Sequence, residues 1–507
     1  MLKRDQYRTP GFTIVELLIV IVVIAILAAI TIISYNGISN RAKQSAAASA
    51  AQQAAKKVLN YSTDNAEQFP ADLPLAGVKN DANTTFEYTF DNGSKSYCIT
   101  ATFQGVSYYV SNTAANPTPG VCSGHSGGVN GPWTGIAAGS EQTCGINSGK
   151  AYCWGYGSEG RLGNGSTANS NIPTQVTSTG VLAGKTLTAI SSGLGHTCVI
   201  ASGQAYCWGR NNSGQLGNST SSNSLVPVAV DTSGVLAGKT VTSISAGTYF
   251  TCAVASGQAY CWGENTYGRL GNNSTTSSTV PVAVDTSGVL AGRTVTAVAA
   301  GAGSHACAAA DGLAFCWGRG LYGRLGDGTT TTYYTPIAVT TGGVMGGKSV
   351  TAVSAHGSHS CSVASGQAIC WGMNGTYGAM GVNDTANAAY VNPTAALTTG
   401  VLSGKIITDI AAGYEGVCVV ASGQPVCWGS NAYGQVGNNS ASTAFAPVAV
   451  DTTGVLSGKT VSKISQGWYQ TCALAHGEVY CWGGGTYGQL GNNTTANSPI
   501  PVKVTNP

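Results

Sequence analysis

The chain has 507 residues, long enough for two or three domains, and only 8% of them are Asp, Glu, Lys or Arg. A net charge of +3 is too small to indicate nucleic-acid binding by itself, and the scarcity of charge is unlike a cytosolic enzyme. Sixteen cysteines at regular spacing favour an oxidising compartment, so we expect an exported protein.

The N-terminus combines a short basic leader, residues 1–11, with an apolar segment, residues 12–33, that contains a single carboxylate, Glu16. At about 1.5 Å per residue this segment is long enough to cross a bilayer. The cations of the leader predict a cytoplasmic N-terminus, with the rest of the chain outside. A carboxylate near hydrocarbon costs about 2.5–3.5 kcal/mol, so Glu16 is expected to have a function and a partner.

The sequence Gly11-Phe12, followed by Glu16 at the fifth position after the glycine, resembles the N-terminal signal of bacterial type IV prepilins. The resemblance implies that a prepilin peptidase cuts between Gly11 and Phe12 and methylates the new amine. It also implies that Glu16 pairs with the N-terminus of a neighbouring subunit during assembly. Ile33 stands where that family often has a proline, so the usual kink is not implied. An ordinary signal anchor is the alternative, although it needs neither the Gly-Phe junction nor the carboxylate.

Residues 12–60 predict one long helix that lies in the membrane before assembly and contacts other pilin subunits in the filament. Between Arg41 and Lys57 the segment is rich in alanine, the best helix former, whose small side chain also lets helices approach closely. A coiled-coil stalk is the alternative, but no heptad of large apolar residues is visible.

Residues 61–128 predict a small β head of the pilin type and a linker. Aromatic and polar residues alternate from Phe86 to Ser111, with two breaks at turn residues, which predicts a three-stranded meander. Cys98 and Cys122 are expected to form a disulfide that ties the last strand to the following loop.

Residues 129–507 contain an internal repeat in which Cys-Trp-Gly is followed by Gly-x-Leu-Gly. The spacing gives seven copies, each long enough for four short strands, and seven sheets arranged radially make a propeller. The motifs resemble regulator-of-chromosome-condensation repeats, which implies a seven-bladed propeller. The nucleotide-exchange role attached to that family is not expected here, because its partners are cytosolic. The fold class expected is multidomain α+β: a long pilin helix with a small β head, then an all-β seven-bladed propeller with one disulfide per blade.

The two ends of the repeat region suggest how the ring closes. The first copy begins at Trp133 without a preceding Pro-Val strand, and the chain ends with such a strand at 501–504. We therefore expect the last strand to complete the first blade and so remove an exposed sheet edge.

Each copy has two cysteines separated by eight residues. In the second copy, a hairpin turning at Ser202-Gly203 places Cys198 opposite Cys207 at a non-hydrogen-bonded position, where Cα atoms are close enough for a disulfide. Structural zinc is bound by four ligands and one blade contains only two thiols, so we expect no metal. No other cofactor is expected. The pairs predicted in the seven copies are Cys144–Cys153, Cys198–Cys207, Cys252–Cys261, Cys307–Cys316, Cys361–Cys370, Cys418–Cys427 and Cys472–Cys481.

Little in the sequence supports catalysis. Residues 342–349 match a phosphate-binding loop pattern, but the sibling loops break the pattern and no helix is expected to follow. No Ser/His/Asp set, paired carboxylate cluster or calcium loop is visible, so the chain is not expected to be an enzyme. The least regular blade, with Tyr333, Tyr334, Met380 and Tyr390, is the place where we expect a specific binding surface.

One repeated loop position carries a cation in six copies. These cations are either solvated loop ends or a ring that docks an anionic cell-surface polymer or, with weaker support, DNA. They are Lys185, Lys239, Arg293, Lys348, Lys405 and Lys459.

Together these features predict a minor type IV pilin, at the filament tip or sparsely placed, whose propeller adheres to a cell or surface through a glycan, protein or polymer ligand. Its expected location is the cytoplasmic membrane before assembly and the extracellular pilus afterwards. The alternative is a pseudopilin that primes assembly of a secretion or DNA-uptake machine.

Overall fold

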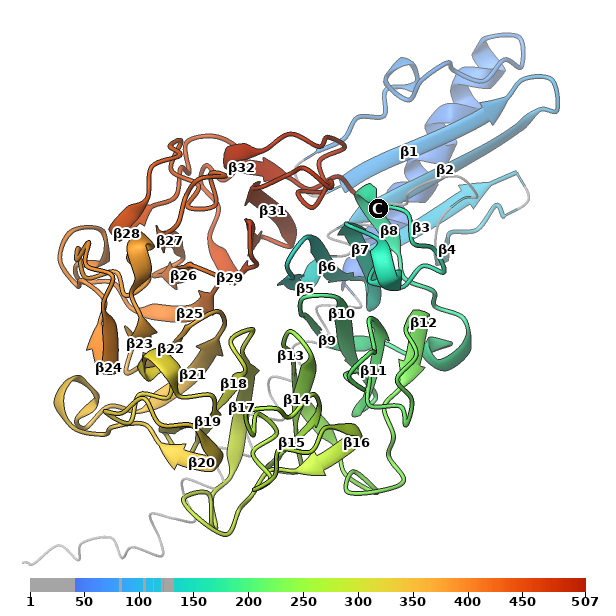
Figure 1. Cartoon of the computed structure of the whole chain (residues 1–507). Coiled ribbons are helices and arrows are strands. Elements are labelled where there is room, and N and C mark those ends of the chain that lie inside the picture. The colour runs from blue at the N-terminus through green and yellow to red at the C-terminus, as the bar shows by residue number, and fades with distance from the viewer. Residues whose placement is uncertain (1–41, 82–83, 104–105, 113, 120–121, 123–131) are drawn as a thin grey trace, which may run out of the picture. The chain divides into compact units, whose positions relative to one another are not determined.

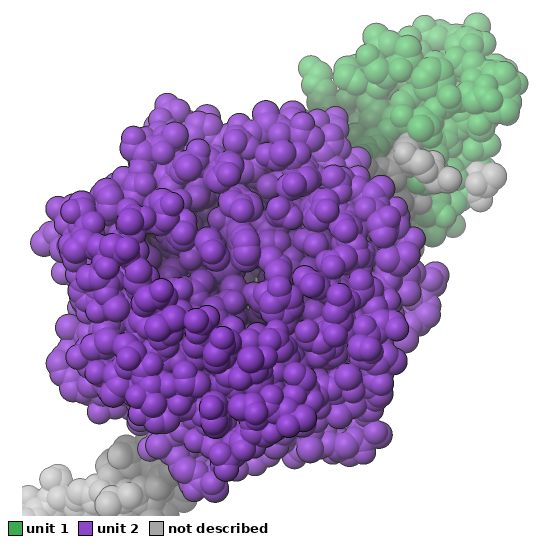
Figure 2. Space-filling model, viewed as in Figure 1, with its two compact units in different colours: residues 1–131 green, residues 132–507 purple. Residues whose placement is uncertain are grey.

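The computed structural model describes residues 42–81, 84–103, 106–112, 114–119, 122 and 132–507 (Figure 1). The chain forms two compact units, Met1–Gly131 and Pro132–Pro507, which are coloured separately in Figure 2. The leader, the apolar segment and the predicted processing and assembly residues Gly11, Phe12 and Glu16 lie outside the described residues. Among the helices that the structure describes, none is long and apolar enough to span a membrane.

Unit 1 consists of a helix over residues 42–64 and an antiparallel sheet in the order β1-β2-β3-β4. The helix buries Ala51 and Val58 against Ile99 of the sheet. Small and β-branched side chains three to four residues apart form one face, as an amphipathic helix requires. The elements are η1 (Pro74–Ala76), β1 (Thr84–Asp91), β2 (Ser96–Phe103), β3 (Val106–Ser111) and β4 (Thr118–Pro119).

Unit 2 is a ring of four-stranded antiparallel sheets, each with its first strand toward the centre and its fourth at the rim (Figure 1). The face in view in Figure 2 is hollowed near its middle. The first four sheets comprise β5 (Trp133–Ala138), β6 (Gln142–Asn147), β7 (Lys150–Gly155) and β8 (Ser170–Gln175); β9 (Leu187–Ser192), β10 (His196–Ala201), β11 (Gln204–Gly209) and β12 (Ser224–Ala229); β13 (Val241–Ala246), β14 (Phe250–Ala255), β15 (Gln258–Gly263) and β16 (Ser278–Ala283); β17 (Val295–Ala300), β18 (His305–Ala310), β19 (Leu313–Gly318) and β20 (Tyr333–Ala338).

The remaining sheets follow the same plan, and short 3-10 helices lie in the loops. The sheets comprise β21 (Val350–Ala355), β22 (His359–Ala364), β23 (Gln367–Met373) and β24 (Ala389–Ala395); β25 (Ile407–Ala412), β26 (Gly416–Ala421), β27 (Gln424–Gly429) and β28 (Ala444–Ala449); β29 (Val461–Gln466), β30 (Gln470–Ala475), β31 (Glu478–Gly483) and β32 (Ser498–Lys503). The 3-10 helices are η2 (Ser158–Gly160), η3 (Gly180–Leu182), η4 (Leu321–Gly323), η5 (Gly343–Met345), η6 (Gly375–Tyr377) and η7 (Gly400–Leu402).

The described residues contain eight four-stranded sheets, one more than the seven that the repeats predicted. Seven of them lie in unit 2. The eighth is the sheet of unit 1, for which the sequence predicted three strands. Its fourth strand, β4, is short and pairs Thr118 with Tyr109 of β3. A strand this short shows no alternation of apolar and polar residues from which it could be predicted. Each of the eight sheets carries one disulfide.

Burial explains the composition of the strands in each sheet of unit 2. The second strand is buried along its whole length, as in β10 and β14, and accordingly consists mostly of small and apolar residues. The fourth strand pairs on one side only and carries exposed residues, such as Leu225 and Val226 in β12. A proline, Pro227 in that strand, is tolerated because an edge strand has amide groups that need not enter a ladder.

The ring does not close in the predicted way. Strand β32 pairs with β31 of its own sheet, with Cys481 opposite Val502, and the first sheet has its own fourth strand, β8. The prediction that the last strand completes the first blade is therefore wrong. The Pro-Val strand ends each repeat rather than beginning it, so the first copy lacks nothing. Backbone bonds across the seam run from Trp133 N to Gly477 O at 2.8 Å and from Asn493 N to Asn171 O at 3.0 Å.

Candidate functional site

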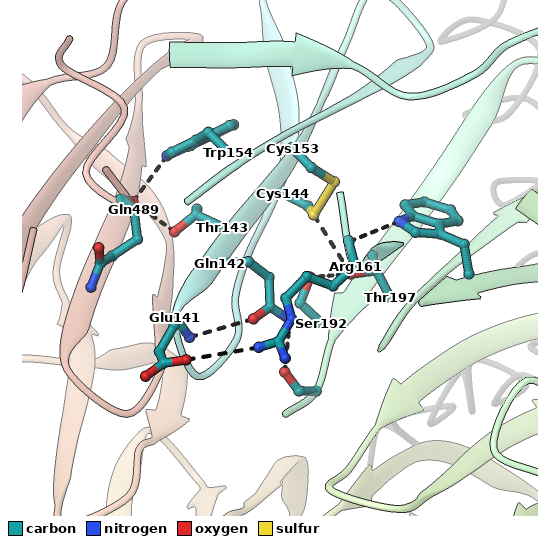
Figure 3. Close-up of a disulfide and its surroundings, with 12 residues drawn as sticks. Glu141, Gln142, Thr143, Cys144, Cys153, Trp154, Arg161, Ser192, Thr197 and Gln489 are labelled. Carbon is teal, nitrogen blue, oxygen red and sulfur yellow. Dashed lines mark hydrogen bonds and ion pairs between the residues drawn. A yellow bond between two sulfur atoms is a disulfide. The ribbon is translucent and has the colours of Figure 1, made fainter. Parts of the chain in front are cut away.

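The two repeat motifs join each sheet of unit 2 to the preceding one. The indole nitrogen of Trp208 donates a hydrogen bond to the backbone oxygen of Arg161 at 3.0 Å, and an equivalent bond of 2.9–3.0 Å recurs at every blade. At the closure of the ring, Trp154 and the Thr143 hydroxyl both donate to the oxygen of Gln489, each at 2.9 Å (Figure 3). All seven indoles are fully buried. The motifs therefore build a frame that holds the loops at repeated positions.

The cysteines form the second element of this frame. Cys198 lies opposite Cys207 in the hairpin register that the sequence predicted, with Cα atoms 4.1 Å apart. Among the described residues there is no free cysteine and no group of three or more His, Cys, Asp and Glu that could hold a metal ion. The disulfides are Cys98–Cys122, Cys144–Cys153, Cys198–Cys207, Cys252–Cys261, Cys307–Cys316, Cys361–Cys370, Cys418–Cys427 and Cys472–Cys481.

The six cations predicted to form a ring lie at the end of the sheets that holds the hairpin turns, because the first strand starts there: Leu187 pairs with Ala201. All six are half-buried. Four cover an aromatic ring with the centre of charge 5.1–5.8 Å from its centroid, a cation–π contact. Packing accounts for these four: Lys185 on Tyr206, Lys239 on Tyr260, Arg293 on Phe315 and Lys459 on Tyr480.

The opposite end of the sheets holds the loops between first and second strands, and here a pocket of about 580 Å³ opens. Its lining comes from six of the seven sheets, including Leu194 from the second and Trp468 from the last. The loop after β19 contributes Arg319, Tyr322 and Arg324. A pocket of this size, lined by aromatic and a few charged groups, has the character of a ligand site.

Three buried arginines occupy the same place in the Gly-x-Leu-Gly motif. Arg161 pairs with Glu159 at 3.1 Å and Arg269 with Glu264 at 3.3 Å. The third, Arg324, has no carboxylate within ion-pair distance among the described residues. A buried cation costs free energy of folding unless it is paired or well hydrogen-bonded. Arg324 therefore depends on hydrogen bonds alone, unlike Arg161 and Arg269.

Arg324 is held by neutral oxygens. Its guanidinium donates to the backbone oxygen of Leu321 at 2.7 Å, to that of Gly303 and to the Ser358 hydroxyl at 3.2 Å. Burial, together with the charge of Arg319, lowers the pKa of Arg324 to about 10. The side chain is therefore still a cation at neutral pH, and it forms part of the pocket wall.

Aromatic side chains surround these charges. Tyr414 and Trp468, from the loops of the last two sheets, are stacked with centroids 4.5 Å apart and planes at 26°. The guanidinium of Arg319 lies over Tyr267 at 4.8 Å. Tyr322 and Tyr414 are 40% and 41% exposed, so part of each side chain is accessible to a ligand.

Three histidines at one repeated position are buried beneath this end of the ring. The Nε2 atoms of His196 and His305 each lie 2.8 Å from a hydroxyl of the next blade, Thr251 and Ser360. Burial lowers the pKa of His196 to about 3 and that of His359 to about 4, and it lowers the pKa of His305 well below its ordinary value. All three are neutral at pH 7.

The binding surface that the sequence predicted in the least regular blade is only partly supported by the exposure of its residues. Tyr334 is exposed, but Met380 is fully buried in the core and so cannot take part in a binding surface. Sequence reasoning missed the pocket loops. The sequence feature that could have located these loops is a variable position in an otherwise constant repeat, just after the first strand of each sheet. The variable segments are Ser140-Glu141, Leu194-Gly195, Thr248-Tyr249, Ala302-Gly303-Ser304, Gly357-Ser358, Tyr414-Glu415 and Trp468-Tyr469.

Family models match both ends of the chain. The model described as Regulator of chromosome condensation (RCC1) repeat matches residues 148–200, 202–254, 256–308, 311–363, 426–474 and 476–507. The model described as Prokaryotic N-terminal methylation motif matches residues 8–32. The RCC1 matches leave out residues 364–425, which contribute Asn374, Tyr414 and Glu415 to the pocket.

Known proteins support the same assignment. Ultraviolet-B receptor UVR8 of Arabidopsis thaliana is 31% identical over 372 residues, which is 72% of this chain and 80% of that protein. E3 ubiquitin-protein ligase HERC2 of Homo sapiens is 30% identical over 331 residues, 64% of this chain but 6% of the ligase. Among solved structures, Prp20p of Saccharomyces cerevisiae has a TM-score of 0.60 at 21% identity, covering 74% of this chain and 86% of Prp20p. Human WBSCR16 has a TM-score of 0.59 at 20% identity, covering 71% and 89%. These two structures are similar in fold. The chain belongs to the family of regulator of chromosome condensation (RCC1) repeat proteins.

Proposed function

We propose that this chain is a minor type IV pilin, placed at the filament tip or sparsely along it, whose propeller adheres to a cell or surface. The observation that carries the proposal is the joining of an N-terminal methylation motif to RCC1 repeats in one chain. The motif implies a pilin-like N-terminus, and a disulfide in every sheet suits an oxidising exterior.

The adhesive role rests on the propeller. The frame of indole bonds and disulfides resists local opening, and it presents a pocket of about 580 Å³ with exposed aromatic side chains. We further propose that the chain binds its target rather than catalysing a reaction on it. Its partners would be other pilin subunits through the N-terminal helix, the prepilin peptidase and an external ligand.

The first test is processing. The mature chain is expected to begin at Phe12 with a methylated amine, because the peptidase that the motif implies cuts after Gly11. Mass spectrometry of the N-terminal peptide from the native host measures this directly. Gly11→Val is expected to leave the leader attached, whereas Gly37→Ala, well beyond the cut, serves as the control. A mature wild-type chain that still begins at Met1 would contradict the pilin assignment.

Deletion of the gene then tests the role of the chain. Loss of attachment to cells or surfaces, with filaments still present by electron microscopy, is the expected result for an adhesin. Loss of the filaments themselves would instead favour the second candidate, a pseudopilin that primes assembly of a secretion or DNA-uptake machine. The methylation motif supports that candidate equally well, whereas the ligand-sized pocket favours adhesion.

A further inference from the structure

One wall of the pocket carries two cations without a carboxylate partner. Five residues before Arg269 stands Glu264, which pairs with it at 3.3 Å. Five residues before Arg324, at the equivalent place, stands Arg319. The repeat that elsewhere neutralises its buried arginine here adds a second positive charge. Neither Arg319 nor Arg324 forms an ion pair within the described part of the chain, and both line the pocket.

A buried histidine in the same lining has one ring nitrogen without a partner. His359 is 1% exposed, and its Nε2 atom has no hydrogen bond among the described residues. The equivalent atoms of His196 and His305 meet the hydroxyls of Thr251 and Ser360, and in those two rings it is the Nδ1 atom that has no hydrogen bond among the described residues. The residue at that place in the next sheet is Val417, which has no hydroxyl. An unpaired buried polar atom costs free energy and calls for a partner.

The other wall offers flat aromatic surface and a hydrogen-bond acceptor. Tyr414 and Trp468 are stacked at 4.5 Å, and Tyr414 is 41% exposed. Glu415 also lines the pocket, and it has no ion-pair partner among the residues described. Burial raises the pKa of Glu415. One pocket therefore combines unpaired cations, an unpaired carboxyl group and aromatic faces.

We propose that this pocket binds a carboxylated saccharide, such as a short uronic-acid oligomer. The sugar carboxylate accepts charge-assisted hydrogen bonds from Arg319, and the buried positive charge of Arg324 behind it adds to the attraction. The C–H face of a sugar ring packs on Tyr414 and Trp468, which removes apolar surface from water. Glu415 accepts hydrogen bonds from sugar hydroxyls. The pocket of about 580 Å³ lies within the range of small-ligand sites.

A saccharide fits this site better than a bare anion or a phosphorylated peptide. A phosphate group concentrates up to two negative charges on one compact group and has no hydroxyl donors for Glu415, whereas a uronic-acid oligomer carries one carboxylate per ring and many hydroxyl donors. The aromatic pair would have no role with an inorganic anion. This inference names a ligand class for the proposed adhesion. It rests on the proposed function only for the location of the ligand on a cell or surface.

The test is calorimetric titration of the full chain in detergent with three probes: trigalacturonic acid, the neutral galactose trimer and inorganic phosphate. We expect trigalacturonic acid to bind more tightly than either of the other probes by about tenfold or more. Absence of binding would overturn the proposal. Equal affinity for the neutral trimer would contradict the recognition of a carboxylate by the two arginines. Equal affinity for phosphate would contradict the assignment of the ligand as a saccharide.

The decisive variant is Arg319→Glu, which gives the fourth blade the pairing that Glu264 and Arg269 have in the third. It is expected to fold, with a melting temperature no lower than that of the wild type, and to lose affinity for trigalacturonic acid by about tenfold or more. Arg324→Gln is a second variant, because Gln215, Gln435 and Gln489 stand at its place in other blades. Lys239→Gln removes one charge at the opposite end of the ring and is expected to bind normally.

The same variants separate this inference from the proposed adhesion. If wild-type chain binds trigalacturonic acid while cells carrying Arg319→Glu attach as well as wild type, the pocket stands and adhesion through it fails. If gene deletion abolishes attachment but the purified chain binds no acidic saccharide, adhesion stands and the pocket assignment fails. An equal loss of affinity in Lys239→Gln would show that overall charge, and not this pocket, attracts the anion.

Discussion

Reduction of the disulfides is expected to unfold unit 2 or leave it barely stable. Each of its seven disulfides closes a loop between cysteines nine residues apart, and the chain-entropy model assigns about 2.5 kcal/mol to a loop of that length. Seven such contributions exceed the net stability of roughly 5–15 kcal/mol that is typical of a domain. The chain is reduced in denaturant and diluted with reductant present, and its thermal unfolding is followed by circular dichroism beside the oxidised chain.

Two double variants serve as controls for the reduction experiment. Replacing Cys198 and Cys207 by alanine is expected to cost about 2–3 kcal/mol, a graded fraction of the full effect. Replacing Cys98 and Cys122, which lie in unit 1, should leave the unfolding transition of unit 2 in place. A reduced chain that melts within a few degrees of the oxidised one would show that the disulfides add little to the packing of the sheets.

Acid is expected to destabilise the propeller between pH 6.5 and about pH 4.5, above the range in which most carboxylates titrate. Burial lowers the pKa of His196 to about 3 and that of His359 to about 4, and it lowers the pKa of His305 in the same direction. In the unfolded chain these groups titrate near 6.5, so below that pH the unfolded state binds more protons. The free energy of unfolding then falls by about 1.4 kcal/mol per pH unit for each histidine, and the loss is complete only below the folded pKa.

Denaturant unfolding at pH 7.0, 6.0 and 5.0 measures this slope. The triple variant His196→Gln, His305→Gln and His359→Gln is the matched control, because Gln142 and Gln470 stand at the same repeated position. The Gln142 amide donates to the backbone oxygen of Gly193 at 2.9 Å, so glutamine fits there. Burial raises the pKa of Asp409 and Glu415, which opposes the histidines near the lower end of the window. An equal slope in the triple variant would assign the acid sensitivity to other groups.

Much of the fold could be predicted because it depends on short-range geometry. The turn at Ser202-Gly203 sets the hairpin register, and the register places Cys198 opposite Cys207. The spacing of Cys-Trp-Gly and Gly-x-Leu-Gly likewise announces the repeated sheets. The one strand missed in unit 1, β4, is only two residues long, too short to show a periodic pattern.

The candidate site could not be predicted in this way. The pocket brings Arg319 and Arg324 into one lining with Tyr414 and Trp468, residues about 90 to 150 positions apart, which only the curvature of the ring makes neighbours. The cations that the sequence did single out, such as Lys239, are at the other end of the sheets and cover aromatic rings. A repeated position predicts a shared face, but it does not say whether a side chain on that face is free.

The amino-acid sequence by itself determined the export signal pattern, the repeat, and the pairing of cysteines within each hairpin, because these depend on residues close together in the chain. Only the tertiary structure decided how the ring closes and which charges lack partners. Trp154 and Gln489 meet across 335 positions, and a contact of that range depends on the twist and packing of every sheet between them. The wrong prediction for the last strand has the same cause: a strand of the right composition can pair with either of two sheets, and packing selects one.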